Sequence, residues 1–248
     1  MSFFLMLLAG FFLPLFPLSM VFNALLGRIK NPIARVLLIF IWPQIGVFLL
    51  AWAGLPLDSG FFVGWAVLTA VFYAWRLLTV RVLSQWAGML ATSAWALAWI
   101  IAADLPASSE LHSFALWMSV APALLIFIAI ALQERFGAAY SGLVVGLARA
   151  LPRLSSVIVI VVLAAMALPI FPSFFAMLAL LAHSSILFAL PILLTWLLWS
   201  WAGTRLLNGF VFGPRAETDA ADLSSTTTWG FVGLIATIVV INLIWTGA

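Results

Sequence analysis

The sequence predicts an all-α, polytopic membrane protein with about eight transmembrane helices, and three observations support this fold class. First, 67% of its 248 residues are hydrophobic, 7% are charged, and the mean hydropathy is +1.29. A soluble domain carries roughly 25% charged residues, so this chain cannot cover a surface that faces water. Second, apolar runs of about 20 residues, the length that crosses a bilayer, recur along the chain. Third, the positive charges are distributed unevenly between the runs.

The Lys and Arg residues indicate both the number of spans and their direction. When the apolar runs are read as helices, all ten fall on one side, in loops or at helix ends: Arg28, Lys30, Arg35, Arg76, Arg81, Arg135, Arg149, Arg153, Arg205 and Arg215. The opposite side receives only Asp58, Asp104 and Glu110 as charges. Because positive loops mark the cytoplasmic side, we expect a multi-pass protein of the cell inner (cytoplasmic) membrane with both termini outside.

The four N-terminal spans are predicted at residues 3–26, 33–54, 60–80 and 82–103. A basic loop follows the first span, and a short turn with Pro56 and Asp58 follows the second. Arg81 marks a very short turn between the third and the fourth. A single long helix at this point would reverse the direction of every later span and break the charge segregation, so we predict two spans.

The four C-terminal spans are predicted at residues 114–132, 154–181, 186–212 and 228–245. The sixth span of the chain is long and contains Pro169 and Pro172 near its middle. Two prolines remove two backbone donors, and irregular backbone in the bilayer is tolerated only where protein or a cavity covers it. The pattern predicts a helix broken at these prolines, a feature that marks ion sites in some transporters. A simple proline kink is the alternative.

Two segments are too polar to span, and the whole chain, residues 1–248, is predicted to form one transmembrane domain. In residues 133–153, Leu143, Val144, Leu147 and Leu151 recur at helical spacing, which predicts a helix lying along the cytoplasmic surface. Residues 213–227 are hydrophilic and are predicted to form a cytoplasmic loop. Several tryptophans, among them Trp42, Trp99, Trp117, Trp229 and Trp245, are placed toward span ends and predicted to be interfacial.

The chain lacks the residue patterns of most catalytic and ligand-binding sites. It contains no Cys, so it has neither disulfides nor thiolate metal ligands. It shows no Ser/His/Asp set, no cluster of metal ligands and no phosphate-binding glycine loop, so we expect no catalytic residue, no metal and no cofactor. The high isoelectric point arises from few charges rather than from a basic patch, and nucleic-acid binding is not expected.

Short motifs in the C-terminal half keep the order and spacing of one family. They are Gln133-Glu134-Arg135-Phe136, Val145-Gly146-Leu147-Ala148-Arg149, Leu151-Pro152-Arg153-Leu154, Leu168-Pro169 with Phe174, and Phe212-Gly213-Pro214. They resemble the antiporter-like, proton-translocating membrane subunits of respiratory complex I, membrane-bound hydrogenases and Mrp cation/proton antiporters. Residues 12–18 and 23–28 resemble the family's first helix. The family has fourteen core helices, and removing six leaves eight with the same parity. The chain is identified as a shortened, degenerate member.

The resemblance also shows what this chain lacks. Proton translocation requires ionisable groups near the middle of the membrane. The family carries a basic or acidic residue after its broken helix, and the matching position here is Met177. The two glycines of the break are matched by Ile170 and Pro172, and a family histidine in an earlier helix is matched by residues 117–120, which hold no ionisable group. His112 and His183 lie near the outer span ends. As histidines titrate near neutrality, they are candidates for proton uptake or release, although ordinary interfacial histidines would look the same.

Three functions remain open. The first is a non-pumping accessory subunit, not itself an enzyme, that packs beside a full-length relative moving H⁺ or Na⁺. The second is an accessory membrane subunit of an energy-coupled, DAB-type inorganic-carbon uptake complex, with segments 133–153 and 213–227 facing a soluble partner. The third is a stand-alone secondary carrier. Candidate interface residues are Glu134, Arg135, Arg149, Arg153 and Arg205. Glu134 and Arg135 cap the fifth span, through an ion pair or a subunit contact.

Overall fold

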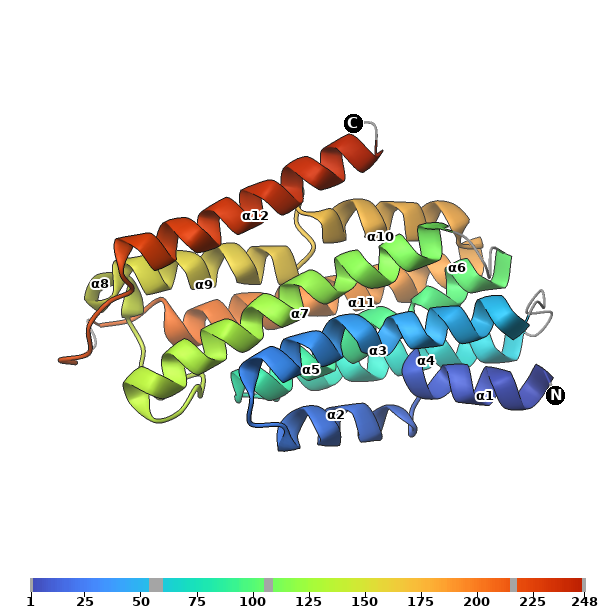
Figure 1. Ribbon diagram of the computed structural model, residues 1–248, viewed down its shortest axis with the longest axis horizontal. Helices are drawn as coiled ribbons and strands as arrows, with labels where there is room; N and C mark the ends of the chain where they lie inside the picture. The colour runs from blue at the N-terminus through green and yellow to red at the C-terminus, as the bar shows by residue number, and fades with distance from the viewer. Residues whose placement is uncertain (1, 54–59, 105–108, 215–217, 247–248) are drawn as a thin grey trace.

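A computed structural model describes residues 2–53, 60–104, 109–214 and 218–246, and its regular elements there are helices. In chain order they are α1 (Ser2–Phe12), α2 (Ser19–Arg28), α3 (Pro32–Ala53), α4 (Gly60–Leu77), α5 (Leu83–Ala96), α6 (Ala98–Asp104), α7 (Ser109–Phe136), α8 (Leu147–Ala150), α9 (Pro152–Ala165), α10 (Pro172–His183), α11 (Ile186–Phe210) and α12 (Ser225–Thr246). The helices lie along one long axis (Figure 1). The all-α fold class is confirmed.

Eight passes along this axis follow from the helices. Within the described residues, six stretches are long and apolar enough to cross a membrane: α3, α4, α5 with α6, α7, α11 and α12. The helices α1, α9 and α10 are apolar but shorter. Helix α1 is followed end to end by α2, and α9 is followed end to end by α10 (Figure 1). Each pair supplies one further pass in two pieces. The predicted polytopic architecture is therefore confirmed.

The described cations gather at one end of this bundle. They lie where α2, α4, α7 and α11 end and where α3 and α9 begin, at the left of Figure 1. We call this the basic end, and the other end, where α7 begins beside Glu110, the acidic end. Helix α1 begins and α12 ends toward the acidic end (Figure 1). Arg215, Pro56, Asp58 and the side chain of Asp104 lie outside the described residues.

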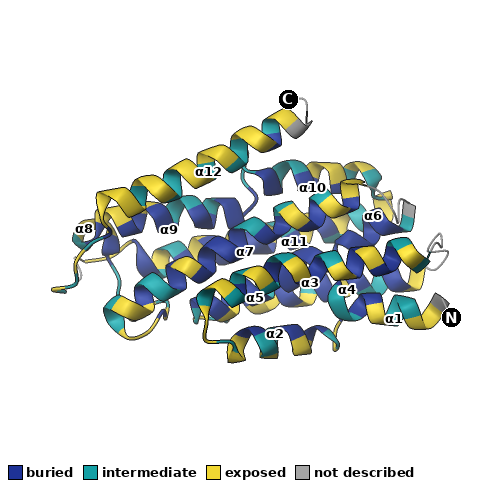
Figure 2. Ribbon diagram, in the orientation of Figure 1, coloured by how far each residue is buried: buried dark blue, intermediate teal, exposed yellow. Residues whose placement is uncertain are grey.

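The centre of the bundle is the pass formed by α5 and α6. Of the most apolar stretch in Leu83–Ala103, 89% is buried, compared with 11% in Ser225–Ile244 of α12. Small residues allow this burial because they let helix backbones approach closely. A Cβ on Gly88 of α5 would lie 2.8 Å from Asn23 Oδ1 on α2. Figure 2 shows the contrast between the buried centre and the exposed α12, which contacts α9 and α10 at the edge.

Not every predicted span is continuous. The sixth is broken between α9 and α10, as expected from its prolines. The first, predicted as one helix over residues 3–26, is also broken, between Phe12 and Ser19, where Pro14 and Pro17 lack backbone donors. The fourth turns at Leu97 between α5 and α6. The very short turn predicted at Arg81 is confirmed, because α4 ends at Leu77 and α5 begins at Leu83.

Candidate functional site

The break between α9 and α10 holds strained backbone. Ala167 has a φ of 51° and Ile170 a φ of 90°, a region that side-chain-bearing residues rarely adopt. Ile170 stands where the family resemblance places a glycine, so the glycine-like backbone is present although the glycine is not. Pro172 is buried at the start of α10, where its missing N–H costs nothing, and Pro169 is exposed in the linker.

Neutral side chains satisfy the carbonyl groups that this break frees. The hydroxyl of Ser173 donates to the Ala164 carbonyl oxygen at 2.7 Å. The indole Nε1 of Trp196 donates to the Met166 carbonyl oxygen at 3.0 Å. Such pairing is needed because an unsatisfied backbone group is costly where there is no water. The break is thus stabilised by a serine and a tryptophan from neighbouring helix segments.

Met177, the position matched to the family's titratable residue, is fully buried in α10. Helix α10 packs against α6, α7 and α9 there, and a thioether can neither gain nor lose a proton at physiological pH. The region matched to a second titratable residue, residues 117–120, contains Ser119, which is also fully buried. Its hydroxyl accepts from Trp95 Nε1 at 3.0 Å and donates to the Ala115 carbonyl oxygen at 2.7 Å. Both positions carry neutral groups.

The break between α1 and α2 is satisfied in the same way. Trp99 Nε1 donates to the Leu13 carbonyl oxygen at 3.0 Å, and Trp65 Nε1 donates to the Phe16 carbonyl oxygen at 2.6 Å. The Phe16 amide donates to the Thr69 hydroxyl at 3.1 Å. The interfacial assignment of Trp99 is wrong, because its side chain is fully buried. Trp99 lies near a span end in the sequence, but the break between α1 and α2 places the Leu13 carbonyl oxygen within reach of its indole.

Several other polar groups of the interior form neutral pairs between helices. Asn23 Nδ2 donates to the Thr92 hydroxyl at 2.9 Å, the Ser19 and Tyr73 hydroxyls lie 2.8 Å apart, and Trp199 Nε1 donates to the Ser93 hydroxyl at 3.0 Å. These bonds join α2 to α5, α2 to α4, and α11 to α5. Hydroxyl, amide and indole groups hold helices together. A proton relay needs groups that take up and release a proton, and these pairs do not supply them.

The acidic end carries the titratable pair of the described residues. His183 Nε2 lies 2.9 Å from Glu110 Oε2, an ion pair when the histidine is protonated, and 56% of the Glu110 side chain is exposed. His112 Nδ1 lies 2.7 Å from Gln44 Oε1, and Gln44 Nε2 donates to the His112 carbonyl oxygen at 3.1 Å. The two predicted histidines therefore sit at the predicted end but engage different partners.

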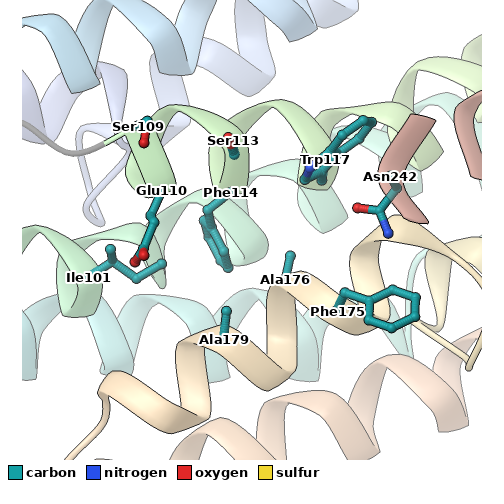
Figure 3. Close-up of a pocket in the computed structure, with 10 residues that line it drawn as sticks. All are labelled: Ile101, Ser109, Glu110, Ser113, Phe114, Trp117, Phe175, Ala176, Ala179 and Asn242. Carbon is teal, nitrogen blue, oxygen red and sulfur yellow. The ribbon is translucent and has the colours of Figure 1, made fainter. Parts of the chain in front are cut away.

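A cavity of about 400 Å³ opens beside this pair, between α6, α7, α10 and α12. Figure 3 shows Glu110 and Ser113 of α7 on one wall, Phe175 and Ala176 of α10 on another, and Asn242 of α12 across from Trp117. Trp117 also lines a second, smaller cavity of about 20 Å³ that reaches Ser173 and Pro172 at the helix break. The two cavities share Trp117, and the one at the break is lined by apolar and neutral groups.

At the basic end, two of the resembling motifs contact each other. The Gly146 amide donates to the Phe212 carbonyl oxygen at 3.1 Å, and a Cβ on Gly146 would collide with the Pro214 carbonyl oxygen. Gly146 also has a φ of 73°. The continuous surface helix predicted for residues 133–153 is wrong, because glycines at positive φ interrupt it and only the short helix Leu147–Ala150 lies between the end of α7 and the start of α9. Leu147 and Leu151 are buried against the bundle.

The predicted interface residues take different roles. Arg135 donates from Nε to the Ala221 carbonyl oxygen at 3.0 Å and from Nη1 to the Ala131 carbonyl oxygen at 2.8 Å. Glu134 is exposed, and the described residues show no ion pair between it and Arg135, so the alternative of a subunit contact stays a prediction. The partner of Arg135 is a carbonyl oxygen because the 218–224 segment folds back over the end of α7. Arg149 and Arg205 are exposed.

Asp222 is a structural residue that sequence patterns did not indicate. Its Oδ2 accepts from the Arg153 amide at 2.9 Å and its Oδ1 from the Leu154 amide at 3.0 Å, so it caps the start of α9 from a distance in sequence. The Arg153 guanidinium donates to the Leu223 carbonyl oxygen at 3.2 Å. A capping residue 68 positions away from the helix it caps leaves no local signal.

The fold has solved counterparts. No protein-family model matches the chain, and no curated protein matches it in sequence. A chain of respiratory complex I from Thermus thermophilus with bound NADH matches 95% of this chain at a TM-score of 0.80 and 20% identity. A chain of an archaeal respiratory membrane complex, the membrane-bound sulfane sulfur reductase, matches 96% at 0.78 and 16% identity. A chain of the Mrp complex from Dietzia sp. DQ12-45-1b matches 87% at 0.74 and 15% identity.

These counterparts are longer than this chain, which covers 52%, 52% and 42% of them, respectively. The chain therefore has the fold of about half of each solved chain. The predicted likeness to membrane subunits of respiratory complex I and of Mrp antiporters is confirmed at the level of the fold. At these identities the likeness concerns the fold, and the activity of this chain has to be argued from its own residues.

Proposed function

We propose that this chain is a non-pumping, antiporter-like subunit of a multi-subunit, ion-translocating membrane complex, and that it catalyses no reaction itself. In this role it packs beside a full-length relative that moves H⁺ or Na⁺ and holds that relative in place. It resides in the cell inner membrane with both termini outside and its basic end in the cytoplasm, the orientation that the positive loops favour.

One observation carries this proposal. Across the described spans, the buried polar side chains between the two ends are hydroxyl, amide and indole groups, and those of Ser19, Thr92, Ser93 and Ser119 hydrogen-bond to side chains of other helices. The position matched to a titratable residue of the family holds Met177, which is fully buried. Without a carboxylate or amine between Glu110 and the basic end, a proton crossing this bundle would have no group to hold it.

The exposed apolar surface supports membrane partners. Helix α12 packs mainly along α9 and α10, and most of its surface faces outward. Exposed large side chains continue onto α11, which carries Leu187, Leu190, Leu194, Leu197 and Trp201. In a bilayer these faces contact either lipid or the apolar helices of neighbouring subunits.

Reconstitution of the purified chain tests the non-pumping role. Liposomes containing the chain and a pH-sensitive dye are expected to dissipate an imposed proton or sodium gradient no faster than empty liposomes. A gradient that collapses with the chain present would overturn the role and support the stand-alone carrier.

Purification from native membranes tests the assembly. A tagged chain extracted in mild detergent is expected to bring with it a longer membrane protein of the same fold. Recovery with a large soluble protein instead would favour an inorganic-carbon uptake assembly, in which the surfaces formed by residues 133–153 and 213–227 would contact that partner. Recovery of the chain alone, with membrane extraction shown to preserve other complexes, would contradict the subunit role.

A further inference from the structure

A cavity at the basic end contains a buried positive charge that the described protein atoms do not neutralise. It has a volume of about 270 Å³ and lies between α2, α3, α4 and α5. Arg35 and Arg76 line it together with the polar side chains of Asn23, Ser84 and Gln85, and none of its lining residues is acidic. The chemistry of this cavity does not depend on the proposed function.

Arg35 is the unusual residue of the cavity. Its side chain is only 9% exposed, and its Nε donates to the Leu26 carbonyl oxygen at 3.0 Å. In the described part of the chain, neither of its Nη atoms has a hydrogen-bond or carboxylate partner. Removing an ion from water is unfavourable unless an opposite charge and hydrogen bonds compensate it. The guanidinium therefore lacks an anion, and the cavity it lines is where an anion would fit.

Two further features of the cavity favour an anion. Arg76 adds a second guanidinium from the end of α4. Helix α5 begins at Leu83, so Ser84 and Gln85 lie in its first turn, and Val82 before them makes no side-chain capping bond. The partial positive charge and free amide groups of a helix N-terminus attract negative groups. Guanidinium groups bind the oxygens of phosphate in pairs, so the cavity combines the donors that phosphate recognition uses.

We propose that this cavity binds a phosphate group, supplied by the headgroup of an anionic phospholipid or by soluble phosphate. The position agrees with both sources. Arg35 is the fourth residue of α3 and Arg76 the second-last of α4, so both lie where the spans leave the hydrocarbon. Basic pockets between transmembrane helices at that depth bind anionic headgroups.

A second basic cavity provides the comparison. It has a volume of about 430 Å³ and is lined by Arg81 and Arg205, both of which are exposed. Water can solvate these two charges, as it can that of Arg76, so this second cavity has no counterpart of the buried Arg35. Arg205→Gln is therefore the matched control, because it removes one arginine from the same end of the bundle without touching the proposed site.

The first arm of the test uses lipid. The full chain in dodecyl maltoside is titrated with dioleoylphosphatidylglycerol or with dioleoylphosphatidylcholine, and bound lipids are counted by native mass spectrometry. One phosphatidylglycerol is expected to bind at least about tenfold more tightly than phosphatidylcholine, which corresponds to about 1.4 kcal/mol. Arg35→Gln and Arg76→Gln are each expected to weaken that binding about tenfold, while Arg205→Gln leaves it unchanged.

The second arm uses inorganic phosphate. Sodium phosphate and sodium chloride at equal ionic strength are compared for their effect on the melting temperature of the chain without added lipid. A phosphate-specific rise that Arg35→Gln abolishes, with no arginine-dependent lipid binding, assigns the site to soluble phosphate. Equal binding of both probes by the wild type, Arg35→Gln and Arg76→Gln overturns the proposal.

A folding defect would not obscure the result. The side-chain amide introduced by Arg35→Gln can still donate to the Leu26 carbonyl oxygen, and Arg35→Lys retains the charge while losing the paired donors. If both variants fail to fold, Arg76→Gln decides the question, since Arg76 is exposed and its loss leaves the core intact. Unchanged phosphatidylglycerol and phosphate binding by Arg76→Gln would then overturn the site.

Discussion

The two broken spans both interrupt a helix within the bundle, but their surroundings differ. In each, prolines interrupt a helix, and indole and hydroxyl groups from other helix segments pair with the freed backbone. The α1–α2 break buries Leu13 and Leu15 fully and exposes 40% of Phe16, whereas the α9–α10 break exposes Pro169 and 67% of Ile170. The first break is thus the more deeply buried of the two. The second lies at the edge of the bundle and carries the strained backbone.

The largest loss of stability is expected at the α1–α2 break. Trp99→Ala removes a fully buried indole, its stacking on Phe62 at 5.4 Å and the donor to the Leu13 carbonyl oxygen. We expect a loss of about 3–5 kcal/mol in the free energy of unfolding, measured for the purified chain in detergent. The matched change Trp196→Ala removes a half-buried indole at the second break and is expected to cost about 2 kcal/mol. Equal losses would show that the two breaks are equally embedded.

The next largest loss of stability is expected when the Ser173 hydroxyl at the α9–α10 break is removed. Ser173→Ala removes the side-chain donor to the Ala164 carbonyl oxygen, which keeps its bond from the Ala167 amide at 3.1 Å, and we expect a loss of about 0.5–1.5 kcal/mol in the same measurement. Ser156→Ala is the control, since that exposed serine on α9 donates to the Pro152 carbonyl oxygen at 2.8 Å where water can replace it. If the two variants melted alike, the pairing at the break would add nothing to stability.

Backbone strain at the α9–α10 break predicts that relieving it slightly raises the free energy of unfolding. Ile170→Gly relieves a β-branched residue at a φ of 90°, worth about 1–2 kcal/mol, and costs about 0.5–1 kcal/mol in the entropy of the unfolded chain. The net expectation is a stabilisation of about 0.5 kcal/mol. Ile41→Gly, at an exposed site inside α3, should instead lose about 1 kcal/mol. A loss of equal size at both sites would mean that Ile170 is unstrained.

The smallest effect is expected at Met177. Met177→Leu conserves side-chain volume in the core and removes no titratable group, so ion coupling by the native complex should be unchanged. The measurement is ion-coupled activity of membranes that carry the variant, with expression matched to the wild type. Abolished coupling in a stably assembled complex would show that this position takes part in ion movement.

The sequence predicted the eight passes, because apolar length and the positions of Lys and Arg follow from the bilayer rather than from packing. It also predicted the break at Pro169 and Pro172. It did not predict the break at Pro14 and Pro17, although the proline spacing is the same. Proline alone does not determine whether a helix breaks, since Pro43, Pro122 and Pro191 lie inside α3, α7 and α11 without breaking them.

What the sequence determined by itself was the all-α membrane fold, the end of the bundle that carries its cations and the absence of an acidic or amine side chain at the position of Met177. The tertiary structure decided which backbone groups found partners. Trp99 reaches the carbonyl oxygen of Leu13 across 86 positions, and Asp222 caps α9 from 68 positions away. The same holds for Arg35, whose charge is ordinary in the sequence and unbalanced in the fold. Hydropathy and charge act on each segment separately, whereas hydrogen-bond partners and burial depend on which segments pack together.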